Sequence, residues 1–108
     1  MGSRLELDDI FRDIINITDP IDGDSHVYFQ PPESRKMKYP AIRYKLKGMR
    51  KVYANNGTYQ LLPSYEVTLI DQNPDSEYLE KILQLPYCSF DRFYPADNLN
   101  HFVFNLFH

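Results

Sequence analysis

Two stretches of the chain carry apolar residues at helical spacing. In the first, Leu7, Ile10, Phe11, Ile14 and Ile15 recur every three or four positions, which places them on one face of an α-helix. Ahead of them, residues 3–6 read Ser-Arg-Leu-Glu and have the residue types of a capping box, whose Ser and Glu side chains satisfy open backbone N–H groups. We therefore predict a helix over residues 4–16, ended by the turn-forming segment 18–24.

The second helical stretch follows an acidic segment. Asn73 is a residue type typical of a helix N-cap, and Pro74 suits the first helical position, where its missing N–H costs nothing. Asp75 and Glu77 then fall in the first turn, where the positive end of the helix dipole favours acids. We predict a helix that is capped by Asn73, begins at Pro74 and ends before Pro86, with a buried stripe formed by Leu79, Ile82 and Leu83.

Alternating residues predict strands in the middle of the chain. The segment 27–29 is short and β-prone and precedes two prolines, which is typical of an edge strand. Over residues 40–47, apolar positions alternate with Arg43, Lys45 and Lys47, so one strand face is apolar and the other cationic. We expect Gly48 to end this strand and residues 55–57, Asn-Asn-Gly, to form a tight turn before the next one.

The remaining strands complete the predicted sheet. Tyr65, Val67 and Leu69 alternate with partly polar residues up to Asp71, and the segment 88–107 has the pattern of two strands joined at residues 97–100. In the last strand, Val103 and Phe107 indicate that its second face is partly covered as well. We predict one domain over residues 1–108, of the α+β class, with an antiparallel or mixed sheet packed by two α-helices in the order α-β-β-β-α-β-β.

Composition narrows the class of protein. The chain has 108 residues, 15% of them aromatic and one of them Cys. A single Cys forms no internal disulfide, and no Cys/His spacing indicates zinc. No apolar run approaches the ~20 residues of a membrane helix. We expect a soluble, unsecreted protein whose many aromatic side chains serve a small core and a protein interface.

Charge is distributed unevenly along the chain. The net charge is -3, but every charged residue from Arg35 to Lys51 is a cation, whereas residues 1–24 and 66–108 are predominantly acidic. With Tyr39, Tyr44 and Tyr53 interleaved, the basic segment has the composition of a nucleic-acid-binding surface. It also fits a solvated strand face, or a basic surface that attracts the acidic surface of another copy head to tail. The last interpretation accounts for the whole charge pattern.

Catalytic motifs are weak in this sequence. Asp71, Asp75 and Glu77 have the residue types of a metal or acid-base site, but the helix-capping interpretation explains their positions without a ligand. Ser89, Asp91 and His101 include the residue types of a catalytic triad, yet no nucleophile turn of the G-x-S-x-G type frames any serine. Four glycines make a phosphate-binding loop improbable. We therefore expect no catalytic residue, no metal and no cofactor.

Four segments resemble the small tail-completion, or tail-terminator, proteins of tailed bacteriophages. They are VYFQPPES (27–34), MKYPAIRY (37–44), YEVTLIDQNPDS (65–76) and LPYCSFDRFYPADNLNHFVFNLF (85–107). The resemblance covers most of the chain and implies a non-enzymatic α+β subunit of a ring, commonly a hexamer, at the head-proximal end of the tail. Such a ring stops polymerisation of the tail tube protein, contacts the head-tail connector protein and leaves a channel for DNA. The implied location is the virion tail, assembled in the bacterial cytoplasm.

Within that interpretation we infer two interfaces. We expect the cations to contact acids of a neighbouring copy or connector and not to line the channel, because a basic wall would retain the passing DNA. The loop over residues 93–100 is the second candidate, since aromatic and Asn side chains suit docking. The predicted interface residues are Arg43, Lys45, Lys47, Arg50, Lys51, Asp71, Asp75, Glu77, Asp91, Phe93, Tyr94, Asp97 and Asn98. A head-tail connector or neck protein and a small nucleic-acid-binding domain remain alternatives.

Overall fold

In the part of the chain that the structure describes, two helices pack on one mixed sheet. The computed structural model describes residues 4–15, 26–31, 38–53, 57 and 59–108. Their strands pair in the order β1-β2-β3-β5-β4, with β1 parallel to β2 and the other neighbours antiparallel. This confirms the predicted α+β class and element order. The elements are α1 (Arg4–Ile14), β1 (Val27–Phe29), β2 (Ala41–Tyr53), β3 (Tyr59–Asp71), α2 (Tyr78–Leu83), β4 (Cys88–Ala96) and β5 (Leu99–Phe107).

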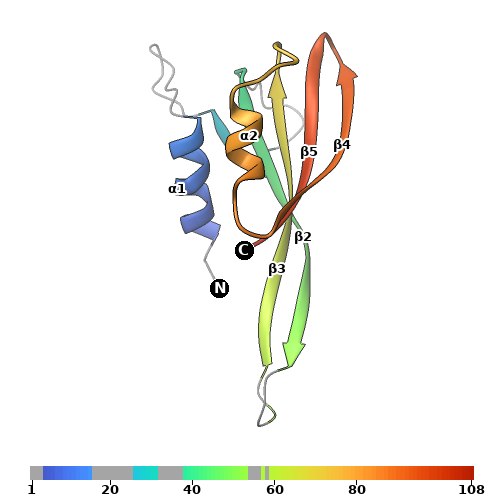
Figure 1. The fold of residues 1–108 in the computed structure, drawn as a ribbon. Helices are drawn as coiled ribbons and strands as arrows, with labels where there is room; N and C mark the ends of the chain where they lie inside the picture. Colours follow the sequence, from blue (N-terminus) through green and yellow to red (C-terminus); the bar gives the residue numbers. More distant parts are fainter. Residues whose placement is uncertain (1–3, 16–25, 32–37, 54–56, 58) are drawn as a thin grey trace.

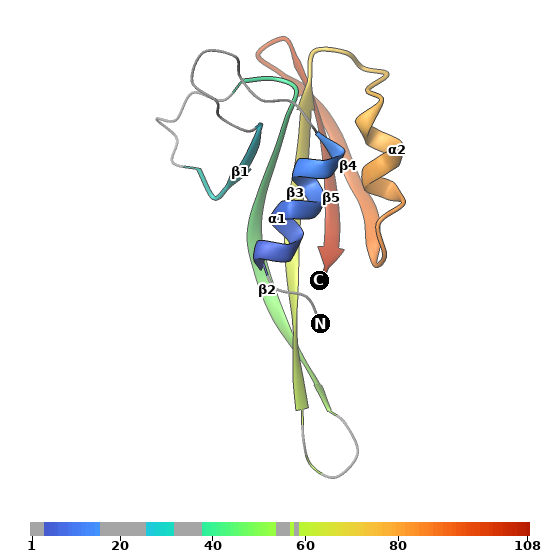
Figure 2. The same cartoon turned by 90° about the vertical axis from the view of Figure 1, so that its left-hand side faces the viewer.

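Both helices cover the same face of the sheet (Figures 1 and 2). The apolar face of α1, predicted from its spacing, packs against the inward rows of the three central strands. Burying these rows from water is the main stabilising contribution to the fold. The fully or nearly fully buried core residues include Leu7, Phe11, Ile15, Ile42, Tyr44, Val67, Leu69, Ile82, Phe104 and Leu106.

Tyr44 is at the centre of this core. Its ring lies 5.0 Å from the ring of Phe11, 5.0 Å from that of Phe29 and 6.1 Å from that of Tyr65, centroid to centroid. Its hydroxyl donates a hydrogen bond to Asp8 Oδ1 at 2.7 Å. Burial, and then this bond to a carboxylate, raise the pKa of Tyr44. Because Tyr44 is 0% exposed, the hypothesis that it stacks on nucleic-acid bases is wrong.

The opposite face of the sheet is partly apolar, as the sequence predicted. Ile70 and Val103 are buried there, and Phe107 is half-buried. His101 lies in the same row as Ile70, because the two are register partners, and its ring stacks on Tyr94 with centroids 4.7 Å apart. Burial lowers the pKa of His101, since a charged imidazolium would be poorly solvated in this position.

The first helix was predicted closely. α1 spans Arg4–Ile14, and the N–H of Ile15 still donates to the carbonyl of Phe11 at 2.9 Å. The predicted end at Asn16, the capping serine at position 3 and the turn over residues 18–24 all lie outside the described residues.

The predicted start of the second helix is wrong. α2 begins at Tyr78 rather than at Pro74, and the residues before it, including the predicted cap Asn73, form a turn. Asn73 Oδ1 accepts a hydrogen bond from the Asp75 N–H at 3.0 Å, and Ser76 Oγ accepts one from the Tyr78 N–H at 3.3 Å. These short side-chain bonds satisfy the backbone locally and so compete with the helix. Glu77, at the N-cap, makes no side-chain capping bond.

The predicted end of β2 at Gly48 is also wrong. The pairing of β2 with β3 shifts by one residue between Leu46 and Gly48 and then continues to the pair Tyr53–Tyr59. A β-bulge therefore replaces the expected strand end. β1 pairs with β2 only at residues 42–44, and β5 pairs with β3 only from Ser64 onward. Residues 48–53 and 59–63 thus form a two-stranded hairpin, here called the arm, that projects from the sheet (Figure 2).

Candidate functional site

The arm exposes apolar and cationic side chains. The exposed fraction is 76% for Tyr53, 59% for Met49 and 54% for Tyr59. Between them, Lys51 Nζ lies 4.6 Å from the ring centroid of Tyr59 and 5.8 Å from that of Tyr53. Such cation–π contacts hold a charge beside aromatic surface. Aromatic residues, Met and Arg are enriched at protein interfaces relative to ordinary surface, and the arm carries all three.

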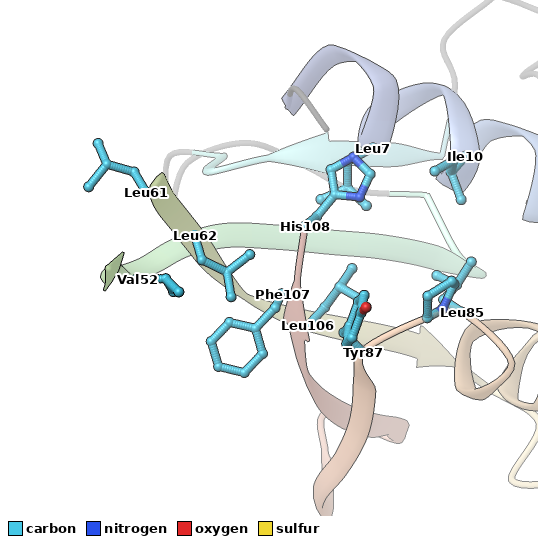
Figure 3. A pocket seen from close by; sticks show the side chains of 11 residues that line it. Leu7, Ile10, Val52, Leu61, Leu62, Leu85, Tyr87, Leu106, Phe107 and His108 are labelled. Carbon is cyan, nitrogen blue, oxygen red and sulfur yellow. The ribbon is translucent and has the colours of Figure 1, made fainter. Parts of the chain in front are cut away.

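An apolar hollow of about 520 Å³ lies where the arm leaves the sheet. We call it the notch; Figure 3 shows most of its lining side chains in close view. The arm supplies one side, α1 a second, and the α2–β4 connection with the chain end a third. The lining residues are Leu7, Ile10, Val52, Leu61, Leu62, Leu85, Pro86, Tyr87, Leu106, Phe107 and His108.

The predicted cations of β2 lie in three different places. Arg43 and Lys45 line a polar groove of about 560 Å³ on the sheet face that carries no helix, together with Glu66. Lys47 Nζ donates to Asn105 Oδ1 on β5 at 2.9 Å. Arg50 and Lys51 are on the arm. The structure therefore does not bring the five predicted cations into one surface.

A chain of ion pairs crosses the helix-free face. Glu66 is 3.1 Å from Lys45 Nζ and 3.2 Å from Arg92 Nη2, and Arg92 Nη1 is 2.6 Å from Asp91. Burial alone would raise the pKa of Glu66, but hydrogen bonds and charges from Lys45 and Arg92 outweigh burial and lower it. Lys45 and Asp91, both predicted as contacts for other copies, are thus paired within the same chain.

The remaining predicted acids gather at the end of the molecule away from the arm. Asp71, Asp75 and Glu77 lie in or beside the β3–α2 connection, and Asp97 lies in the β4–β5 turn. Asn100 Nδ2 donates to the carbonyls of Asp71 at 3.3 Å and Gln72 at 3.1 Å, which joins the two loops. Figure 1 shows both loops at the end of the sheet opposite the arm.

The predicted docking loop over residues 93–100 is a tight hairpin. Asp97 and Asn98 have φ angles of 53° and 63°, the left-handed values that a two-residue type I′ turn requires. Phe93 is 47% exposed and packs against Phe102 with centroids 5.1 Å apart. Tyr94 is half-buried on the other face, against His101. Asp97 and Asn98 thus lie in the turn, whereas Phe93 and Tyr94 lie on opposite faces of the sheet, so the four residues do not form one docking surface.

The residues with catalytic residue types do not converge. Ser89 pairs with Asn105, four residues along β5 from His101, a separation of roughly 13 Å along a strand. Cys88 is half-buried, and burial raises the pKa of its thiol, which disfavours the nucleophilic thiolate. Within the described ranges, no three His, Cys, Asp or Glu side chains form a possible metal site. In that part of the chain no helix is long and apolar enough to cross a membrane.

The arm and the notch are the features that sequence reasoning missed. The signal was present as the alternation of Met49, Lys51 and Tyr53 and of Tyr59, Leu61 and Pro63. It was hidden because Gly48 was interpreted as the end of the strand rather than as part of a bulge. The notch had no signal, since it is built from five separate stretches of the sequence.

Comparisons with known proteins assign the chain to no family. No family model, curated protein or solved structure matches it.

Proposed function

We propose that this protein is a structural subunit of a tailed bacteriophage virion, a tail terminator that forms a ring on the tail tube. The observation that carries the proposal is the projecting arm. A small α+β domain with a complete core has no need of an apolar hairpin outside that core, whereas an assembly subunit needs a surface for its neighbours. The resemblance of segments 27–34, 37–44, 65–76 and 85–107 to tail-completion proteins supplies the kind of assembly.

The proposed mechanism requires contacts only. The end of a growing tube exposes unpaired surface, and a ring that covers this surface without presenting a copy of it stops further addition. The ring then offers its other face to the head-side connector, and DNA passes through the centre without specific binding. The two unlike ends of this chain, a basic arm and an acidic loop pair, suit a subunit whose two faces meet different partners.

A nucleic-acid-binding domain is less well supported by the geometry. Tyr44 is buried, and Lys45 is paired with Glu66, so two of the residues expected to hold a nucleic acid have other roles. A head-tail connector remains the alternative, because it differs only in the neighbour that it contacts.

Particles assembled without this protein test the proposal. Negative-stain electron microscopy should show overlong tails, or finished tails that fail to join heads. Filled heads that leak their contents would instead assign the connector role. Normal, infectious particles without the protein would overturn both assignments.

A further inference from the structure

The arm has one face that is almost entirely apolar. Directly opposed residues of an antiparallel pair share a face, and the register pairs Met49 with Pro63, Lys51 with Leu61 and Tyr53 with Tyr59. The contacts of Lys51 with both tyrosine rings agree with this placement. Three apolar or aromatic side chains on this face, Tyr53, Met49 and Tyr59, are more than half exposed. One face of the arm is therefore a strip of exposed apolar surface that contains a single charge.

Within the described residues, the strands of the arm pair only with each other along residues 48–53 and 59–63. One further backbone bond reaches the base of the arm, where the N–H of His108 donates to the carbonyl of Pro63 at 3.1 Å. An isolated two-stranded hairpin is marginally stable in water, and its unpaired edges invite association. A hairpin of this kind is best stabilised by a surface that covers it.

The notch has the complementary apolar character. It is a hollow lined mainly by aliphatic and aromatic side chains, and Tyr87, at its outer side, is 81% exposed. The arm of the same chain forms one wall of the notch through Val52, Leu61 and Leu62, so that arm cannot also fill it (Figure 3). The chain's own arm is thus excluded as the occupant of the notch.

Charge identifies the occupant as a second copy. From residue 47 to residue 64 every charged residue is a cation, namely Lys47, Arg50 and Lys51. Another wall of the notch is α1, whose sequence RLELDDIFRDI has more acids than cations. A basic apolar projection and an apolar hollow beside an acidic helix are thus present on one chain, and each complements the other.

We propose that the arm of one copy occupies the notch of the next copy, head to tail. The contact is heterologous, so successive copies close into a ring when the rotation between them permits it. This inference rests on the proposed function as an assembly subunit and specifies which surfaces join its copies. Tyr53 and Tyr59 supply the projecting rings, and Tyr87 lies at the side of the hollow that receives them.

Oligomeric state in solution tests the inference, measured by size-exclusion chromatography with light scattering over a range of concentrations. The arm variant is Tyr53→Thr with Tyr59→Thr, which keeps β-prone residues in the strands. The notch variant is Tyr87→Asp, because Asp tolerates the φ of 60° at this position. The matched control is Phe90→Thr with Phe93→Thr, two exposed aromatics on β4. Far-UV circular dichroism verifies that each variant is folded.

We expect an oligomer for the wild type and the control, and monomers for the arm and notch variants alone. A mixture of the two monomeric variants should give a one-to-one dimer, since one intact arm then meets one intact notch. Tyr53→Phe with Tyr59→Phe should retain the wild-type oligomer, which separates loss of aromatic contact from loss of fold.

Other outcomes overturn the inference. A wild type that stays monomeric at every concentration, an arm variant that still assembles, or an oligomer lost only in the β4 control would each exclude the arm–notch contact. The proposed function is judged separately. If oligomers depend on the arm but particles that lack the protein are normal, the arm–notch contact stands and the tail role is removed. If particles that lack the protein have overlong tails but oligomers do not depend on the arm, the tail role stands and the arm–notch contact is removed.

Discussion

The hydrogen bond between Tyr44 and Asp8 predicts a measurable loss of stability for Tyr44→Phe. The substitution removes only the hydroxyl, so the ring contacts with Phe11, Phe29 and Tyr65 remain. The lost bond is short, 2.7 Å, and its acceptor is a carboxylate. Hydrogen bonds to charged groups contribute about 1.5–3 kcal/mol to stability.

Two features place the expected loss in the lower part of that range. Asp8 keeps its ion pair with Arg12 at 2.6 Å, and its side chain is 16% exposed, so water can reach the carboxylate once the hydroxyl is gone. We expect Tyr44→Phe to lower the free energy of unfolding by about 1.5–2 kcal/mol. The melting temperature should fall by roughly 6–12 °C in a domain of this size.

Urea unfolding followed by circular dichroism, at concentrations where the protein is monomeric, measures this loss. Tyr87→Phe is the matched control, because its hydroxyl is on an exposed residue and should matter by less than about 0.5 kcal/mol. A double-mutant cycle with Asp8→Ala should show a coupling of about 1 kcal/mol or more between the two side chains. Equal losses for Tyr44→Phe and Tyr87→Phe, or no coupling, would show that the bond between Tyr44 and Asp8 does not stabilise the fold.

Three further predictions concern the loops and the helix-free face. Asn98→Ala should destabilise the β4–β5 turn by about 1 kcal/mol, and Asn98→Gly should be neutral or stabilising, because only the latter accepts the φ of 63° freely; thermal melts compare them. Asn73→Ala should cost about 0.5–1 kcal/mol through the lost bond to the Asp75 N–H, and unchanged melting would show that this bond contributes nothing. Because the pKa of His101 is lowered on folding, the unfolded chain binds its proton first, so stability should fall as the pH drops below about 6.5, the unfolded value. His101→Gln should flatten this part of a stability-against-pH curve, and an identical slope in both proteins would assign the effect to another group.

The sheet was predictable from the sequence because its strands obey a local rule. Ile42, Tyr65, Val67, Phe102 and Phe104 stand at alternate positions of their strands, and each packs in the core on the side that the alternation assigns. The hairpin at residues 97–98 was predictable for a similar reason, since Asp and Asn adopt positive φ more readily than most residues.

The errors arose where two local structures compete for the same residues. Asn73 and Pro74 have helix-start preferences, but Asn73 also closes a turn on the Asp75 N–H, and that turn occurs instead. At Gly48, a strand end and a bulge have the same sequence signal. The choice between them depends on pairing with Ser64, sixteen residues away, whose hydroxyl donates to the Gly48 carbonyl at 3.3 Å. Window-based patterns contain no information about that partner.

The charge pattern along the sequence likewise does not reveal which charges pair across strands. The pairs that the structure shows indicate where an electrostatic interface should be sought. Basic and acidic blocks that are separate along the chain become neighbours across strands, as Lys45 and Glu66 do at 3.1 Å. Cross-strand register therefore neutralises the middle of the basic block within the molecule. Beyond Ser64 the arm has no β5 beside it to supply such partners, so Arg50 and Lys51 keep a basic character at that end. If charge guides assembly of this protein, reversal of these two residues should slow association at low salt far more than reversal of Lys45, and equal effects would place the electrostatic contact on the sheet face instead.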